Sequence, residues 1–337
     1  MSQKFELTQE QKEVMKKINL QSIEEARKRT SKYYTRTPLY YSRTLSRHSS
    51  TDSYLKLECY QPIRVFKIRG ALNKILRLAD SGSKKSLVTF SAGNHGLAVA
   101  YVSNMVGMDA TIIVPITANE AKVRAIGEYE NVKLIKAGKN VQELATYAKD
   151  IVEKEGAVLV HPFGEPDVIS GQGTIGLEIN EDLPEADYVL VPIGGGGLIS
   201  GIATAIKAMR AHPTKIIGVC AEGAPAVYRS FKEGKIIPTA TNTIADGMAA
   251  STTEPLNLRL MLDLVDDMVL VSDEEIRQAM QFILNDLHIM VEPAGAAPIA
   301  AVLQKKFPFG KGKVVSVISG GNANPALLAE ILGKTPA

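Results

Sequence analysis

The feature that most constrains the fold of this chain is an unbroken apolar segment, residues 188–193, that runs directly into four glycines. An apolar segment without polar alternation is typical of a strand buried on both faces of a parallel sheet. The glycines are Gly194, Gly195, Gly196 and Gly197. Residues 198–207 after them are mostly small and apolar and favour a helix. A strand, a glycine loop and a helix N-terminus present free N–H groups at one point, so this segment predicts a phosphate site.

One glycine would be enough for a flexible loop between a strand and a helix. Four of them indicate that another group approaches the backbone closely, and a phosphate is the favoured group. A dinucleotide is less favoured, because no acidic residue follows about 20 positions later at the end of a second strand, where a ribose would need it.

Length and composition limit the class of protein. A chain of 337 residues, 45% of them hydrophobic, can form one large or two medium α/β domains. The net charge of +3 gives no reason to expect nucleic acid, and no apolar segment reaches the roughly 18 residues of a membrane-spanning helix. Cys59 and Cys220 have neither metal-ligand spacing nor a disulfide framework. We therefore expect a cytoplasmic protein with no metal site and with no nucleic-acid or membrane partner.

Predicted strands alternate with helices along most of the chain, which indicates parallel, doubly wound sheets. Residues 8–30 predict one or two surface helices, with Thr8 as N-cap and Gln11 completing a capping box. Ser272 caps a later helix, and the glycine-rich residues 171–176 open another. The expected strands are residues 53–59, 87–90, 110–114, 132–135, 157–160, 188–193, 215–221 and 314–318, with one more inside 263–271.

A second predicted strand delivers a polar loop to a helix N-terminus. The loop begins with Ser91, Ala92, Gly93, Asn94 and His95. Ordinary N-capping by Ser91 or Asn94 would account for it. Its hydroxyl, amide and free N–H groups also suit a carboxylate. Because two anion sites in one chain are uncommon, the loop is a candidate site for a substrate carboxylate.

Lys67 stands at the start of a predicted helix whose apolar face consists of Ile68, Ala71, Leu72, Ile75 and Leu76. Lys67 and Arg69 lie in its first turn, where a cation opposes the helix dipole. This is a poor position for a structural lysine. It suits a lysine that loses its charge by condensing with an aldehyde.

In chain order, these motifs resemble those of the fold type II (β-family) pyridoxal-phosphate enzymes, and more closely those of threonine/serine dehydratases and serine racemases. The resemblance runs from about Thr37 to Asn322. The segments that carry it are 66–71 (Phe-Lys-Ile-Arg-Gly-Ala), 91–96 (Ser-Ala-Gly-Asn-His-Gly), 194–197, 245–247 (Ala-Asp-Gly), 292–296 (Glu-Pro-Ala-Gly-Ala) and 319–322 (Ser-Gly-Gly-Asn). One such motif would be a weak signal, whereas all of them in the family's order are a strong one.

The resemblance implies a role for each candidate residue. Lys67 would hold pyridoxal 5'-phosphate as a Schiff base and, once displaced, take the α-proton of the substrate. The four glycines would bind the cofactor phosphate. Ser319 would face the ring nitrogen and leave it unprotonated, which favours loss of a β-hydroxyl. The other cofactor contacts would be Phe66, Asn94, Gly247 and Glu292, and the substrate contacts Ser91, Ala92, Gly93, Asn94 and His95.

The implied activity is that of a lyase, a dehydratase of the ammonia-lyase type. It would convert L-threonine, L-serine or a related β-hydroxy amino acid to a 2-keto acid and ammonia. The alternatives are a β-replacement enzyme of the cysteine synthase or threonine synthase type and a serine racemase. A non-enzymatic binder of nucleotides or amino acids is the alternative from another class. Ala92 stands where the racemases carry a serine as second base, which implies dehydration without racemisation.

Two departures from the family's pattern bear on substrate and metal. Arg64 and Val65 replace the usual Gly-Ser pair. Arg64 would add a cation near the entrance of the substrate site, so an acidic β-hydroxy amino acid stays a possible substrate. Cys220 and Ala226 stand where related enzymes place acidic ligands of a divalent cation, with Glu222 as the only carboxylate nearby. We therefore expect no metal site.

The implied architecture is α/β with two lobes, each a mostly parallel twisted sheet flanked by helices, and the cofactor in the cleft between them. Residues 1–87 plus 161–337 would form the large cofactor-binding domain. Residues 88–160 would form a small mobile domain that carries the substrate loop. The resemblance also implies a homodimer, and the lack of a regulatory domain implies no feedback inhibition by isoleucine.

Overall fold

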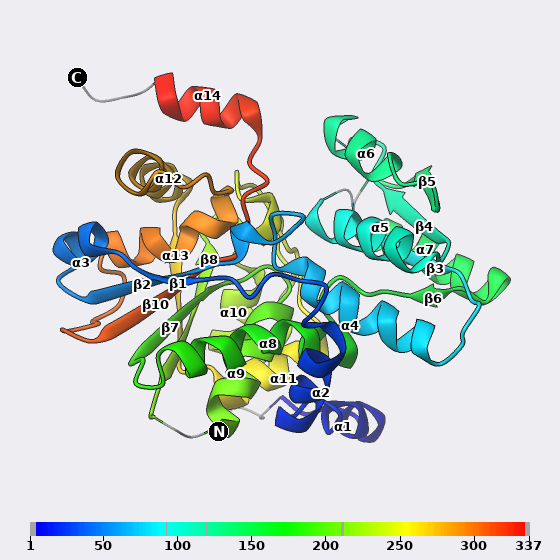
Figure 1. Cartoon of the computed structure of the whole chain (residues 1–337), viewed down its shortest axis with the longest axis horizontal. Coiled ribbons are helices and arrows are strands. Elements are labelled where there is room, and N and C mark those ends of the chain that lie inside the picture. Colours follow the sequence, from blue (N-terminus) through cyan, green and yellow to red (C-terminus); the bar gives the residue numbers. More distant parts are fainter. Residues whose placement is uncertain (1–4, 92, 119, 140, 210–211, 334–337) are drawn as a thin grey trace.

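The computed structural model describes residues 5–91, 93–118, 120–139, 141–209 and 212–333. These residues form two β-sheets, each covered by helices (Figure 1). The predicted α/β class, with two mostly parallel sheets, is confirmed. No helix among the described residues has both the length and the apolar character needed to cross a membrane.

The larger sheet has the strand order β1-β2-β10-β7-β8-β9. Its edge strand β1 is antiparallel to β2 and every other pair is parallel, so the sheet is mixed. The central strand β10 pairs with both β2 and β7, and Ser316 lies opposite both Leu55 and Leu190. The strands are β1 (Leu39–Tyr41), β2 (Asp52–Leu57), β7 (Tyr188–Pro192), β8 (Lys215–Ala221), β9 (Asp267–Val271) and β10 (Lys313–Ile318).

Alternate residues of the central strands supply two separate hydrophobic cores. In β7, Leu190 packs with the helices on one face, whereas Val189 and Val191 pack with those on the other. Every residue of β7 after Tyr188 is buried, as its lack of polar alternation predicts. The helices around this sheet are α1 (Gln9–Met15), α2 (Leu20–Thr30), α3 (Arg43–Ser49), α8 (Pro166–Asp182), α9 (Gly197–Met209), α10 (Ala226–Glu233), α11 (Pro255–Leu264), α12 (Asp273–Leu287), α13 (Pro293–Leu303) and α14 (Pro325–Gly333).

The smaller sheet is entirely parallel and has the order β5-β4-β3-β6. It forms the separate cyan and green part of Figure 1. All four strands come from one continuous stretch of chain: β3 (Leu87–Phe90), β4 (Ala110–Val114), β5 (Val132–Lys136) and β6 (Val158–Leu159). Its helices are α5 (Asn94–Val106), α6 (Glu120–Gly127) and α7 (Val141–Glu155), and α4 (Lys67–Asp80) packs against α5. The division into domains at residues 88 and 160 stays a prediction.

The capping signals were read correctly, but one helix start was wrong. Capping boxes at Thr8 and Ser272 cap the N-termini of α1 and α12. The glycines of residues 171–176 do not open a helix, because α8 already begins at Pro166 and they lie in its middle. They are needed for packing: a Cβ on Gly171 would lie 2.6 Å from the carbonyl oxygen of Arg69 in α4, and one on Gly176 2.9 Å from a carbonyl oxygen of α9. The glycines therefore let three helices approach closely.

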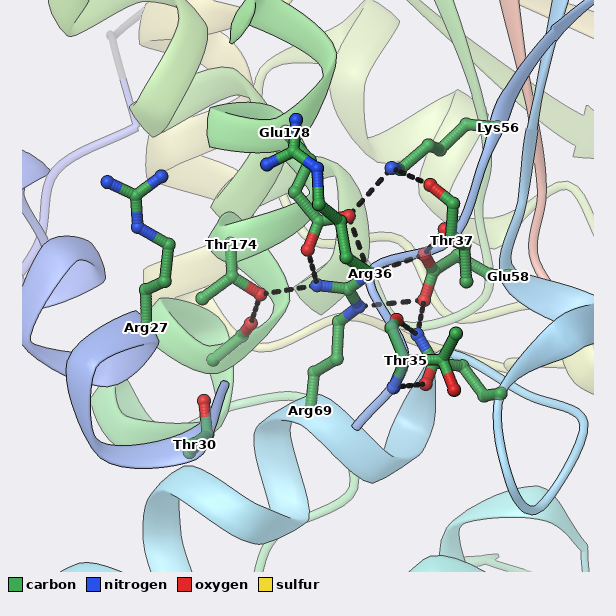
Figure 2. Close-up of polar contacts among 12 residues, drawn as sticks. Arg27, Thr30, Thr35, Arg36, Thr37, Lys56, Glu58, Arg69, Thr174 and Glu178 are labelled. Atoms are coloured by element: carbon green, nitrogen blue, oxygen red, sulfur yellow. Dashed lines mark hydrogen bonds and ion pairs between the residues drawn. The ribbon is translucent and has the colours of Figure 1, made fainter. Parts of the chain in front are cut away.

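A buried network of ion pairs joins α4 to α8 and β2 (Figure 2). At its centre is Arg69, whose five N–H groups donate hydrogen bonds of 2.7 to 3.1 Å to Glu58, Glu178 and Thr174. Lys56 lies 2.6 Å from the second oxygen of Glu178. Two cations thus face two carboxylates, and all four side chains are at most 2% exposed.

Charge pairing in this network outweighs the cost of burial. Burial alone lowers the pKa of Arg69, but the charges of Glu58 and Glu178 reverse that effect and raise it. Burial alone would raise the pKa of Glu178, but Arg69 and Lys56 lower it. Removal of one partner therefore leaves an uncompensated charge in the interior, which is far more costly than loss of a surface pair.

We predict that Arg69→Met lowers the free energy of unfolding by about 3–5 kcal/mol, because Glu58 and Glu178 stay buried without their shared cation. Urea unfolding followed by circular dichroism measures the change.

Arg36→Met is the matched control, because Arg36 is half exposed and pairs with Glu181 and Asp182 at the surface. Its loss should cost about 0–1 kcal/mol. Equal losses in the two variants would contradict the importance of the buried network.

Candidate active site

One cavity of about 560 Å³ lies between the two sheets. The smaller sheet contributes the loop after β3, and the larger sheet contributes the loops after β7 and β10. The candidate residues that line it are Phe66, Lys67, Ser91, Gly93, Asn94, His95, Gly194, Gly195, Gly196, Gly197, Gly247, Glu292 and Ser319. Ala92 lies outside the described residues. The structure therefore brings every described candidate together, while their individual roles stay predictions.

Lys67 is the first residue of α4 and is half-buried in the cavity wall. The preceding residue is fixed by a backbone hydrogen bond of 3.0 Å from Phe66 N–H to the carbonyl oxygen of Ser319. The Nζ atom of Lys67 donates a hydrogen bond of 2.7 Å to the carbonyl oxygen of Pro162. Burial lowers the pKa of Lys67 to about 8, against the opposing effect of the charge of Glu292. The neutral amine, which is the form that attacks an aldehyde, is therefore accessible near neutral pH.

The glycine loop has little room for side chains because the protein itself fills the space. A Cβ on Gly194 would lie 2.6 Å from the carbonyl oxygen of Gly247, and one on Gly197 2.6 Å from that of Phe163. Gly196 has φ +98°, a conformation that side chains disfavour. The run of glycines was predicted to admit a ligand. In the structure it admits these two neighbouring segments, and ligand binding at the loop stays a prediction.

The loop after β3 places an amide at the centre of the cavity. The side-chain N–H₂ of Asn94 donates to both carboxylate oxygens of Glu292, each at 2.9 Å. Its carbonyl oxygen accepts a hydrogen bond of 2.9 Å from the side chain of Asn322. Asn94 thus joins the loop after β3 of the smaller sheet to two segments of the larger domain, at Glu292 and Asn322. A Cβ on Gly96 would lie 2.2 Å from the carbonyl oxygen of Ser91, so this turn requires glycine.

His95 is buried beneath the same loop. Its Nε2 atom lies 2.9 Å from the carbonyl oxygen of Val160, which requires a proton on Nε2. Burial lowers the pKa of His95 to about 3, and the nearby charge of Lys67 acts in the same direction. His95 is therefore neutral at physiological pH and adds no positive charge to the loop.

Two residues suggested by the departures from the family's pattern lie elsewhere. Arg64 is exposed and is not part of the described cavity wall. Cys220 is buried, and burial raises the pKa of its thiol to about 12. Glu222 beside it is exposed. The described residues contain no cluster of three or more side chains that could hold a metal ion.

Sequence reasoning missed the segment that covers the glycine loop. Pro162 accepts the hydrogen bond of Lys67, and the ring of Phe163 occupies the space where Gly195 would carry a side chain. Asn257 donates to the carbonyl oxygens of Phe163 and Gly195, at 3.1 and 3.0 Å. The only signal was position, since Pro162 follows the end of a predicted parallel strand, where such sheets place their ligands.

The residues of the cavity fit pyridoxal phosphate. Lys67 offers an amine of lowered pKa for the aldehyde. The glycine loop and the N-terminus of α9 offer N–H groups for the phosphate. Ser319 offers a neutral hydroxyl, which can bond to the ring nitrogen without protonating it.

Comparisons with known proteins agree with this fit. The chain is 43% identical over 321 residues to an L-threonine ammonia-lyase of Thermotoga maritima, covering 94% of this chain and 79% of the relative. It is 39% identical over 320 residues to the catabolic L-threonine dehydratase TdcB of Escherichia coli K12, covering 94% and 96%. The structure of maize serine racemase superposes with a TM-score of 0.88 at 37% identity, covering 94% of this chain and 97% of that one.

The family described as pyridoxal-phosphate dependent enzymes matches residues 30–320. This match spans both sheets, the glycine loop, Lys67 and Ser319. The chain belongs to the pyridoxal-phosphate dependent enzyme family.

Proposed function

We propose that this protein is a dehydratase of the ammonia-lyase type, which converts L-threonine, L-serine or a related β-hydroxy amino acid to a 2-keto acid and ammonia. The observation that carries the proposal is the juxtaposition of Lys67 with two anion-binding loops in one cavity. The threonine dehydratases among its relatives support the same reaction. Pyridoxal phosphate, when bound, supplies an electron sink for the negative charge that develops at the substrate α-carbon.

Each element of the cavity has a separate task in this reaction. The N–H groups at the start of α5 bind the substrate carboxylate, and the glycine loop binds the cofactor phosphate. Lys67 takes the α-proton at Nζ, which requires the neutral amine. Loss of the β-hydroxyl as water leaves aminoacrylate or aminocrotonate, which hydrolyses to the keto acid and ammonia.

The charges near the cavity favour a substrate with an uncharged side chain. The acidic residues in the described wall are Asp246 and Glu292, and Lys67 is its one basic residue other than neutral His95. Arg64, which could have paired with an acidic substrate, lies outside this wall. Threonine and serine therefore fit better than their acidic analogues.

Serine racemase is the second candidate, because the maize enzyme is similar in sequence and fold. Racemisation needs bases on both faces of the α-carbon. Lys67 supplies one, and the methyl group of Ala92 cannot act as the other. We also propose a cytoplasmic homodimer, on the basis of family resemblance.

We predict that Lys67→Ala abolishes the visible absorbance of the bound cofactor and lowers keto-acid release from threonine and serine by about 10²- to 10⁴-fold or more. Lys84→Ala, an exposed lysine beyond the end of α4, is the control and should leave both unchanged. A wild-type protein that stays colourless with pyridoxal phosphate would exclude the proposed enzymatic function. Turnover that requires an added nucleophile would instead indicate a β-replacement enzyme.

We predict that attachment of pyridoxal phosphate to the cofactor-free protein accelerates as pH rises, is half-maximal near pH 8 and levels off about one pH unit higher. The pKa of Lys67 is lowered to about 8, so the unreactive ammonium form dominates below this pH and the amine above it. The rate at which the visible band returns after mixing with pyridoxal phosphate, measured from pH 6.5 to 9.5 (roughly the range in which Lys67 titrates), gives the inflection. A rate still rising steeply at the upper end would mean that Lys67 titrates like an exposed lysine.

We predict dehydration of L-serine without racemisation, and measurable racemisation after Ala92→Ser, because the new hydroxyl can return a proton from the second face. Chiral analysis of the serine that remains after partial turnover tests both statements. Substantial D-serine from the wild-type protein would show that another group or water serves as the second base.

A further inference from the structure

Residues 160–165 connect β6 of the smaller sheet to α8, and hydrogen bonds fix this connection at two points. At its start, the carbonyl oxygen of Val160 lies 2.9 Å from Nε2 of His95. Farther on, the carbonyl oxygen of Phe163 accepts a hydrogen bond of 3.1 Å from Asn257. The connection is therefore a constrained part of the cavity wall.

The side chain of His161 closes a turn within this connection. Its Nδ1 atom accepts hydrogen bonds from the backbone N–H groups of Phe163, at 3.3 Å, and Gly164, at 2.7 Å. Nδ1 must therefore be unprotonated, and the proton of the neutral ring lies on Nε2, which is 3.8 Å from a carboxylate oxygen of Glu254. Burial lowers the pKa of His161 to about 4, with a further contribution from Lys67. The acceptor at Nδ1 is thus present throughout the working pH range.

Pro162 lies inside the turn that His161 closes. Its carbonyl oxygen accepts the hydrogen bond of 2.7 Å from Nζ of Lys67. The ring of Pro162 fixes its own φ angle, and the residue before a proline is restricted to extended backbone. With the turn closed on the other side, the direction of this carbonyl group is determined.

We propose that His161 is a positioning residue: by closing the turn it directs the Pro162 carbonyl group at Lys67, and this carbonyl holds the lysine amino group whenever it is not bonded to the cofactor. The proposal rests on the proposed function. A neutral amine that donates one N–H to Pro162 keeps its lone pair free, directed away from that carbonyl group. The same contact therefore prepares Lys67 both to attack an aldehyde and to accept a proton.

Two substitutions of similar shape separate this role from a general effect on folding. In His161→Asn the side-chain oxygen can accept the same two N–H groups, as asparagine does in an Asx-turn. In His161→Leu the side chain is branched at Cγ like that of asparagine, but it has no hydrogen-bond acceptor for these two N–H groups. His161→Gln is the reserve variant if the leucine variant does not fold, because its amide lies one carbon farther from the backbone.

The first measurement uses full-length protein from which the cofactor has been removed. Pyridoxal phosphate is added, and the rate at which the visible absorbance of the bound cofactor returns is recorded. His161→Leu should slow this rate about tenfold or more, and His161→Asn should stay within about threefold of wild type. In steady state, His161→Leu should lower kcat by a similar factor with little change in KM, since Lys67 acts after the substrate is bound.

Pyridoxamine phosphate supplies the control, because it has no aldehyde and cannot react with Lys67. Its affinity, measured by calorimetry, should be unchanged in all variants. Weakened binding of this analogue in His161→Leu would mean that the substitution disrupts the whole cavity, and would overturn the proposal. Equal rates in the leucine and asparagine variants would overturn it as well. A wild-type protein that never acquires the visible band would instead overturn the proposed function, and the role of His161 with it.

Discussion

The buried pairing of Arg69 with Glu58 and Glu178 is the interaction on which the geometry of the site depends. Residues two positions apart on an α-helix point in nearly opposite directions, about 200° apart. Lys67 therefore faces the cavity while Arg69 points into the interior, where it is held between η1 (Glu58–Tyr60) and α8 (Figure 2). The helix that carries Lys67 is thus fixed on one side by the ion pairs of Arg69 and at its N-terminus by the backbone hydrogen bond from Phe66 to Ser319. A rotation of α4 that moved Lys67 would have to separate buried ion pairs, so the amine is positioned before any ligand arrives.

The chemistry of the site follows from the small number of charged side chains in the described cavity wall, which are Lys67, Asp246 and Glu292. Lys67 lies in the cavity wall, where desolvation favours its neutral form and the charge of Glu292 limits that effect. The carboxylate of Glu292 is itself held by the amide of Asn94, which links the loops of the two sheets. Burial also lowers the pKa of His95, to about 3, so its ring is neutral at physiological pH. Apart from Lys67, the described wall offers an anion no cationic side chain, only backbone N–H groups and helix dipoles.

The part of the site that could be predicted from the sequence is the part built at strand ends. The loops at Ser91 and Gly194 each follow the carboxyl end of a parallel strand, where such sheets place their ligands, so each could be predicted as a ligand loop from the sequence. They belong to different sheets, and only the family resemblance predicted that they share one cleft. The Arg69 network could not be predicted, because its partners in α8 are 105 and 109 residues away and carry no motif. The glycines of α8 were misread for a related reason: their pattern matches a helix start, and only the neighbouring helices explain it. What a single sequence lacks is the identity of distant neighbours.

The position of β10 in the larger sheet has a consequence for the order in which the molecule can be assembled. The smaller sheet comes from one continuous stretch, residues 87–159, and its contacts are local in sequence. The larger sheet places residues 313–318 between β2 and β7, so its two halves cannot join until that late segment has been synthesised. Ser319 follows directly, and the last residues of the cavity wall, Asn322, Asn324 and Leu327, come after it. A nascent chain therefore has no finished pocket in which to capture a reactive aldehyde, and cofactor loading is a step that follows folding.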